Sequence, residues 1–249
     1  MIIAERVRKS YDAYALNYDA GTGLQRGLAD KIVNALRDDR VKFSHVLDVG
    51  CGTGYLTDKL KATGCDISFG MLSCAKNKSN SRYVQSNAAI LPFAGSIFDL
   101  VVSNAAYQWV PNLAAAFKEV KRVLKPKGKF YFVAFNKNTL CELQSACSQI
   151  NVASSNFPDK AKLVSSLNKA GFKAAAIETF NHKKYYKDLW ELLAVLKNIG
   201  STAAENRNIN GLGWRRILRR ANESYLEKFG SEKGLPATYE AYLVKAENV

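Results

Sequence analysis

The chain has 249 residues, of which 47% are hydrophobic and 23% are charged, and its formal net charge is +14. This composition is that of a folded domain with a sizeable core, which excludes wholesale disorder, and the apolar runs fall well short of the ~20 residues that a membrane span needs. The positive charge favours an acidic partner, whether nucleic acid, a membrane surface or an acidic protein.

Metal-ligand and targeting patterns are not evident. The chain has two histidines and five cysteines, an odd number without zinc-ligand spacing, so we expect reduced thiols and no metal site. Charged residues at positions 5, 6, 8 and 9 are followed by no long apolar run. We therefore expect no signal peptide and a cytoplasmic protein.

The first half of the chain alternates helices with strands. Residues 5–37 are expected to be helical, with Tyr11 and Tyr14 most simply covering a core. The expected strands are residues 45–49, 65–68, 82–85, 98–103 and 129–135, and the expected helices are 55–61, 71–76 and 113–124. A turn is expected at Pro126, Lys127 and Gly128. This alternation predicts an α/β fold with a parallel sheet covered on both faces.

The second half is less regular. A helix is expected from residue 158 to Gly171, with strands over 174–180 and 238–246 and further helices over 188–199 and 212–229. Leucines recur on one face of the 188–199 segment, which most simply indicates core packing. Late strands beside extra helices suggest a cap added to one domain, not a second independent domain.

The central motif is VLDVGCGTG, which spans residues 46 to 54. An apolar strand runs into G-x-G-x-G, where the glycines let the backbone approach a ligand that a Cβ would exclude. A following helix adds free N–H donors. A glycine triplet alone is also compatible with a structural turn or a dinucleotide-binding fold, but the spacing here is not G-x-G-x-x-G. The candidate cofactor-binding residues are Asp48, Gly50, Cys51, Gly52 and Gly54.

This motif, with Asp48 two residues before the first glycine, resembles the first motif of the class I S-adenosylmethionine-dependent methyltransferases. Later segments follow the family's order over residues 46–135. Asp66 and Ile67 with Met71 resemble the second motif, in which an acid holds both ribose hydroxyls. The resemblance adds Asn87 and Ala88 near the adenine, and Asn104 at the strand end beside the methyl group. Taken singly, each segment could be a cap or a turn.

Two features depart from the family pattern. Asn87 stands where an acid commonly accepts a hydrogen bond from the adenine amino group, although its side-chain carbonyl could accept the same bond. Only eleven residues separate Gly54 from Asp66. Either the first helix is clipped or the second strand is very short, and Asp66 could then sit differently against the ribose.

The flanking segments resemble one subfamily, the malonyl-[acyl-carrier protein] O-methyltransferases of biotin synthesis. The resemblance covers nearly the whole chain and includes SNAAYQW at 103–109, LKNIG at 196–200 and LPATY at 235–239. It implies a Rossmann-like fold with a mostly parallel seven-stranded sheet, helices on both faces and a helical cap. One domain would span residues 1–249, with a cofactor-binding half at about 40–135. The N-terminal helices and about 182–235 would form the cap.

The resemblance implies S-adenosylmethionine as the cofactor and methylation of the free carboxylate of a malonyl thioester. A carboxylate is ionised at pH 7 and needs alignment, not a general base. For the catalytic pocket we expect Tyr18, Gln25, Gln108 and Trp109, although Trp109 could equally be core.

The acidic acyl-carrier protein is the expected partner, with no stable nucleic acid and no membrane. Lys197 and Arg207 are candidates for neutralising the substrate carboxylate or a phosphate on the carrier's arm. The carrier protein itself is expected to meet Arg215, Arg216, Arg219 and Arg220, which could otherwise form a solvated helix face.

Three alternatives stay open. A methyltransferase of the same fold could act on a small free acid or a quinone, because fold does not fix the substrate. A nucleic-acid methyltransferase suits the charge, but the chain lacks an Asn-Pro-Pro-Tyr-like motif after the fourth strand. A silent methyltransferase fold serving in assembly is the third.

Overall fold

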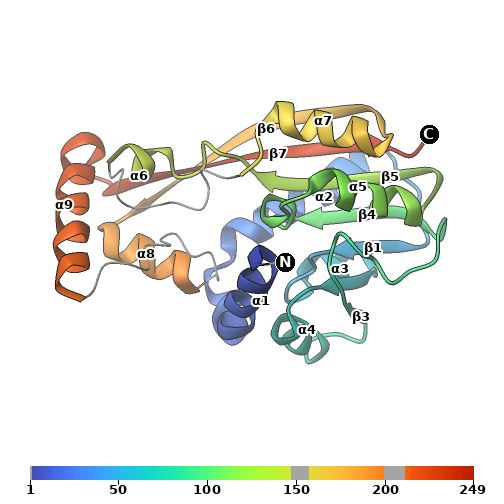
Figure 1. Cartoon of the computed structure of the whole chain (residues 1–249), viewed down its shortest axis with the longest axis horizontal. Helices are drawn as coiled ribbons and strands as arrows, with labels where there is room; N and C mark the ends of the chain where they lie inside the picture. Colours follow the sequence, from blue (N-terminus) through green and yellow to red (C-terminus); the bar gives the residue numbers. More distant parts are fainter. Residues whose placement is uncertain (1, 147–156, 199–210) are drawn as a thin grey trace.

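The computed structural model describes residues 2–146, 157–198 and 211–249. A seven-stranded sheet in the order β3-β2-β1-β4-β5-β7-β6 forms its centre (Figure 1). The strands are β1 (Val46–Val49), β2 (Thr63–Asp66), β3 (Arg82–Gln85), β4 (Phe98–Asn104), β5 (Leu124–Phe135), β6 (Lys173–Tyr186) and β7 (Leu235–Glu247). The first five run parallel, whereas β7 is antiparallel to both β5 and β6. The predicted mostly parallel seven-stranded sheet is confirmed.

Helices cover both faces of the sheet (Figure 1). They are α1 (Ile2–Tyr14), α2 (Gly23–Asp38), α3 (Tyr55–Leu60), α4 (Phe69–Lys76), α5 (Leu113–Val123), α6 (Cys141–Ala146), α7 (Lys160–Ala170), α8 (Leu189–Asn198) and α9 (Gly211–Phe229), with 3-10 turns η1 (Ala15–Gly21) and η2 (Tyr107–Trp109). Neighbouring strand residues point to opposite faces. Leu100 and Val102 join the core beneath α2, whereas Val101 joins the core beneath α5 and α7.

The N-terminal helical region is not one helix. The predicted 5–37 segment consists of α1, the 3-10 turn η1 and α2. Three separate pieces let the chain fold over the sheet, which one straight helix could not do. Both proposed explanations for the short spacing before Asp66 hold, because α3 has six residues and β2 has four. Lys61 ends α3 in the left-handed conformation.

The prediction of a turn at Pro126, Lys127 and Gly128 is wrong. These residues lie inside β5, which starts directly after α5. The register with β4 shifts there: Phe98 pairs with Leu124, but Leu100 pairs with Lys129. The extra residues form a bulge, with Lys127 at a φ of +63°. Turn-forming residues therefore mark a bulge as readily as a chain reversal.

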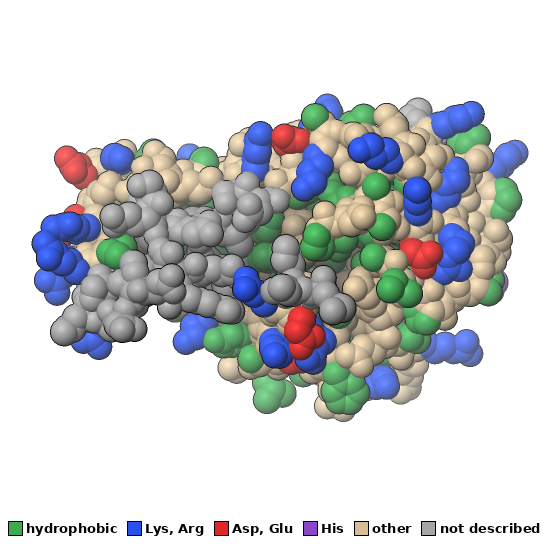
Figure 2. Space-filling model, in the orientation of Figure 1, with side chains coloured by type: hydrophobic (Ala, Val, Ile, Leu, Met, Phe, Trp, Pro, Cys, Tyr) green, Lys and Arg blue, Asp and Glu red, His purple; other side chains and the backbone are tan. Residues whose placement is uncertain are grey.

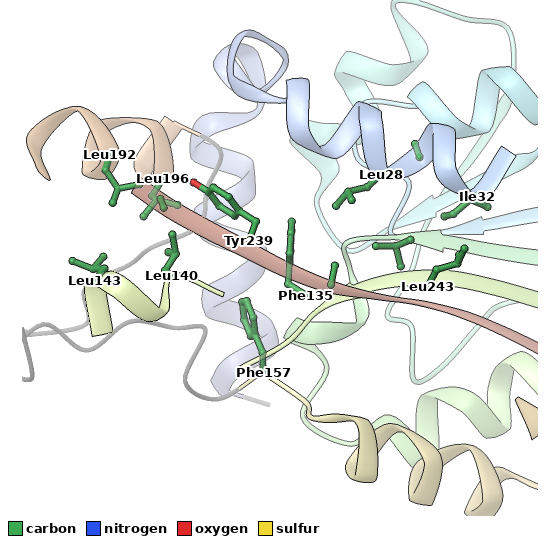
Figure 3. Packing of buried hydrophobic residues seen from close by; sticks show 14 of the residues in the cluster. Leu28, Ile32, Phe135, Leu140, Leu143, Phe157, Leu192, Leu196, Tyr239 and Leu243 are labelled. Carbon is green, nitrogen blue, oxygen red and sulfur yellow. The ribbon is translucent and has the colours of Figure 1, made fainter. Parts of the chain in front are cut away.

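The β6–β7 pair extends beyond the rest of the sheet, and α6, α8 and α9 pack around its far end (Figure 1). Leu143 of α6, Leu192 and Leu196 of α8 and Tyr239 of β7 point toward one another there (Figure 3). The same buried cluster continues to Leu28 of α2, so the extension shares the main core. The core-packing interpretation of the 188–199 leucines is thus correct.

The predicted 174–180 strand was too short, and the expected cap boundary near residue 182 falls inside β6. Pairing with β7 continues as far as Tyr186 opposite Leu235. Residues 181–185 are exposed at the sheet edge, and they carry no apolar alternation that would indicate a strand. The hydrogen-bonded partner, rather than the hydrophobic pattern, sets the length of this strand.

Asn248 fastens the bulge in β5. Its buried amide nitrogen donates to the carbonyl oxygens of Leu124 (3.0 Å) and Lys125 (3.1 Å), and its backbone oxygen accepts from Lys127 N. Asn248→Ala leaves these buried carbonyls unpaired and should lower the free energy of unfolding by about 1–3 kcal/mol in urea denaturation. Glu247→Ala, which breaks only an exposed pair with Lys129, should change it by less than about 1 kcal/mol. Equal effects of the two substitutions would contradict this account.

Candidate active site

A cavity with a volume of about 760 Å³ lies where the strand order reverses, between β1 and β4. Residues just after the carboxyl ends of β1, β2, β3 and β4 line it. Open α/β sheets bind ligands at such a reversal, because the loops of neighbouring strands diverge there. The volume suits a small molecule of cofactor size.

The glycine loop after β1 forms one wall. Gly50 has a φ of +72°, and a Cβ there would lie 2.3 Å from Ala106 Cβ. Gly54 has a φ of +89°, and its Cβ would lie 2.5 Å from the Tyr83 hydroxyl. Gly52 faces open space, with nothing nearer than 3.9 Å, so its backbone can approach a ligand closely.

Asp66, at the end of β2, holds this loop in place. Its two carboxylate oxygens accept hydrogen bonds from Gly52 N (2.9 Å) and Ser68 N (2.8 Å). Each oxygen keeps a further lone pair, and the side chain lines the cavity. Burial raises the pKa of Asp66, while the two backbone N–H donors oppose that shift. The carboxylate is therefore placed to accept a pair of hydroxyl groups.

Asp48 lies beneath the loop, not on the main cavity. Its side chain is 1% exposed, and Thr57 Oγ1 donates to its Oδ2 at 2.7 Å. Its Oδ1 has no hydrogen-bond partner. Burial raises the pKa of Asp48 to about 7. This carboxyl group therefore gains or loses its proton near neutral pH, and a cation beside it would stabilise the ionised form.

The N-terminal segment closes the site from above. Asp12 of α1 accepts hydrogen bonds from Ser68 Oγ (2.6 Å) and Gly70 N (2.9 Å) at the start of α4. Asp19 of η1 accepts one from Thr53 Oγ1 of the glycine loop (2.6 Å) and pairs with Lys78. Neither Asp12 nor Asp19 has a local sequence pattern that indicates its role. Their partners lie more than 30 residues away in sequence.

Aromatic rings enclose the cavity beside these contacts. Tyr11 and Tyr18 meet edge to face with ring centroids 6.1 Å apart, and Tyr11 and Trp109 do so at 6.4 Å. All three line the cavity. The prediction that Tyr11 covers a core is therefore wrong. Its helical spacing places it on the inward face of α1, but that face lines a cavity and does not pack against a core. Burial raises the pKa of Tyr11 and Tyr18, so both keep their hydroxyl protons.

The structure brings most of the predicted site residues together. Those lining the main cavity are Tyr18, Gly50, Gly52, Asp66, Ile67, Met71, Asn87, Ala88, Asn104 and Trp109. Gln25, Asp48 and Cys51 line a smaller chamber beside it. Gly54 and Gln108 line neither space. Gln108 is buried, and its Nε2 donates to Ala105 O at 2.6 Å. Asn87 Oδ1 accepts from Ala89 N at 2.9 Å, so its carbonyl already has one partner.

The predicted basic residues lie elsewhere. Lys197 is exposed near the end of α8, and Arg207 falls outside the described residues. Arg215, Arg216, Arg219 and Arg220 are exposed on α9, at the end of the molecule remote from α4 (Figures 1 and 2). The cation on the described cavity wall is Arg8, whose guanidinium pairs with Glu5 and Asp12. No described residue of 182–235 lines the cavity, so the cap role of that segment stays a prediction.

Comparisons with known proteins bear on this site. A methyltransferase domain model matches residues 47–132. The malonyl-[acyl-carrier protein] O-methyltransferase of Methylovorus sp. is 36% identical over 96% of this chain and 87% of its own length, and that of Geobacter sulfurreducens is 30% identical over 96% and 97%. The chain belongs to the class I S-adenosylmethionine-dependent methyltransferases. A biotin biosynthesis bifunctional protein of Cellvibrio japonicus is 31% identical over 96% of this chain and 49% of its own.

Solved structures show the same fold. A methyltransferase structure from Bacillus halodurans aligns with a TM-score of 0.63 at 18% identity, covering 88% of this chain and 99% of that one. The Haemonchus contortus phosphoethanolamine N-methyltransferase 2, solved with S-adenosylmethionine, aligns with a TM-score of 0.57 at 17% identity, covering 95% of this chain and 57% of that one. This methyltransferase uses S-adenosylmethionine, and its residues fit that group: the glycine loop leaves room for a close approach, and Asp66 offers acceptors for hydroxyls.

Gly50 provides a direct test of this cradle. Gly50→Ala forces a Cβ against Ala106 at a positive φ and should weaken binding of S-adenosylhomocysteine by at least about tenfold in calorimetry, with a lower melting temperature. Gly27→Ala is the matched control, because Gly27 lies within α2 and its Cβ would meet nothing within 4 Å. It should leave binding unchanged and raise stability by about 0.5–1 kcal/mol. Unchanged affinity in Gly50→Ala would rule out the proposed cradle.

Proposed function

We propose that this enzyme transfers a methyl group from S-adenosylmethionine to the free carboxylate of a malonyl thioester on an acyl-carrier protein, an early step of biotin synthesis. The observation that carries the proposal is the similarity, over 96% of the chain, to proteins named malonyl-[acyl-carrier protein] O-methyltransferase. The match extends well beyond the 47–132 methyltransferase core into the segments that differ among methyltransferases.

The described cavity wall suits a carboxylate acceptor. A carboxylic acid with a reference pKa of roughly 4 is ionised at pH 7, so its oxygen attacks without losing a proton. No histidine or lysine lines the described part of the cavity. The two carboxyl groups there already have partners: Asp66 accepts hydrogen bonds from Gly52 N and Ser68 N, and Glu5 pairs with Arg8. The side chains present thus favour alignment over proton transfer.

These residues divide the work of alignment and water exclusion. When bound, the cofactor supplies an electrophilic methyl group on a sulfonium centre. Asp66 would hold the ribose hydroxyls, and Ile67 and Met71 offer apolar contacts for the adenine. Tyr18 and Trp109 line the wall beside the strand end at Asn104, where their rings exclude water and favour a cation. A water-free site keeps the carboxylate as the reacting nucleophile.

The carrier protein is the proposed partner. Acyl-carrier proteins are acidic, and basic side chains gather at the end of the molecule formed by α9 (Figure 2). Such a surface would speed docking by electrostatic steering. The described residues include no helix with the length and apolarity of a bilayer span. We place the reaction in the cytoplasm, in keeping with the unpaired Cys51, Cys65, Cys74 and Cys141.

The decisive assay incubates the enzyme with S-adenosylmethionine and malonyl-carrier protein and measures the acyl group by mass spectrometry. The expected product gains one methyl group in place of a proton, and acetyl-carrier protein gains nothing because it has no free carboxylate. Asp66→Ala should abolish the gain, whereas Asp38→Ala, an exposed aspartate at the end of α2, should not.

Two outcomes would overturn the proposed substrate. One is no methylation although calorimetry shows cofactor binding. The other is faster methylation of a free small acid than of the carrier-bound malonyl group, which would favour a small-molecule methyltransferase of the same fold.

A further inference from the structure

A second hollow lies at the opposite edge of the sheet from the active-site cavity. It has a volume of about 380 Å³ and lies between the segment that follows α2 and the bulged start of β5. The amino ends of β4 and β5 lie at the end of the molecule opposite α9, where basic side chains also gather (Figures 1 and 2). We call this hollow the basic groove. Its ligand is neither the cofactor nor the acyl group, because those bind at the carboxyl ends of the strands.

Cations outnumber acids on the wall of the basic groove. The five cations are Arg40, Lys42, Lys125, Lys127 and Lys129. The two carboxylates there already have partners within the protein. Asp99 accepts from Lys125 Nζ at 2.7 Å and from two backbone N–H groups, and Asp39 pairs with Lys245 at 3.1 Å. Neither carboxylate therefore neutralises the remaining cations.

Three of the five cations have no partner of their own. Lys125 pairs with Asp99, and Lys129 pairs with Glu247. In the part of the chain that the structure describes, no hydrogen bond or ion pair engages the side chains of Arg40, Lys42 and Lys127. Like charges that share a small hollow repel one another, and an anion between them would remove that repulsion.

The backbone at two of these cations favours glycine. Arg40, just after the C-cap of α2, has a φ of +49°, and Lys127, in the bulge of β5, has a φ of +63°. A Cβ crowds the backbone in this left-handed conformation, so glycine would form both turns with less strain. The turns therefore do not need these basic side chains, which suggests that they serve a ligand.

The chemistry of the groove selects the class of ligand. The three free side chains only donate hydrogen bonds, so the ligand must present acceptors and several negative charges in a small volume. Phosphate groups meet both conditions, and arginine and lysine are their usual partners. The volume of the groove suits a small molecule. No aromatic residue lines its described wall, so it lacks the stacking surface of single-strand nucleic-acid sites.

We propose that the basic groove binds a small molecule that carries two or more phosphate groups, through Arg40, Lys42 and Lys127. This site is independent of methyl transfer and of the proposed acyl substrate.

Pyrophosphate is the probe for this site, and calorimetry on the whole enzyme at an ionic strength of about 0.15 M measures its binding. Lys127→Gly should weaken pyrophosphate binding by about fivefold or more, because one ion pair to a multiply charged ligand is lost. Its melting temperature without ligand should stay the same or rise, because glycine relieves the positive φ. Arg40→Gly should behave in the same way. A loss of affinity without a loss of stability separates binding from folding.

Lys61→Gly is the matched control. Lys61 is an exposed lysine with a φ of +51° at the end of α3, and it does not line the basic groove. Its replacement removes the same charge and relieves the same backbone conformation, so pyrophosphate affinity should change less than about twofold. Equal losses in Lys61→Gly and Lys127→Gly would mean that only net charge matters, and the proposal fails.

Two further results would overturn the proposal. One is no binding of pyrophosphate to the wild-type enzyme at millimolar concentration, or binding no tighter than that of citrate, which carries its charge on carboxylates. The other is a single-stranded oligonucleotide that binds more tightly than pyrophosphate and loses affinity in the same two glycine variants, which would make the groove a nucleic-acid surface. Because each test measures binding at the groove, its outcome is separate from that of the methylation assay.

Discussion

The site depends on the carboxylate of Asp66. It accepts one hydrogen bond from the glycine loop at Gly52 and one from Ser68, and the Ser68 hydroxyl in turn donates to Asp12 of α1. One side chain thus joins the two neighbouring strand ends and, through Ser68, the N-terminal helix that closes the cavity. A buried acid that accepts backbone N–H groups remains an acceptor for a ligand, which is why the same residue can organise the walls and hold the ribose.

The local sequence predicted those features of the fold that depend on interactions between residues close in the chain. An apolar strand followed by closely spaced glycines can form few structures, and Gly50 and Gly54 do adopt positive φ values. The alternation of helices and strands likewise predicted the parallel sheet. The predicted turn at Pro126 failed because turn residues also serve a bulge, whose position is set by pairing with β4 and by Asn248. The length of β6 was missed because an exposed edge strand needs no apolar alternation.

The closing wall of the site could not be read from local patterns. Asp12 and Asp19 gain their roles only through partners such as Gly70 and Thr53, distant in sequence. Tyr11 shows the same limit, since its helical spacing is identical whether a core or a cavity lies beneath. Gln25 lines the small chamber beside the glycine loop and not the main cavity, a placement that its position in an amphipathic helix does not specify.

The most direct test of the central claim is the affinity of S-adenosylhomocysteine for Asp66→Asn, measured by calorimetry. Asparagine keeps the shape of the side chain, but its amide nitrogen cannot accept a hydrogen bond from a backbone N–H or a ribose hydroxyl. The account predicts at least a roughly tenfold loss of affinity, because one acceptor of a coupled set is replaced by a donor. An unchanged affinity would show that Asp66 neither holds the ribose nor organises the loop.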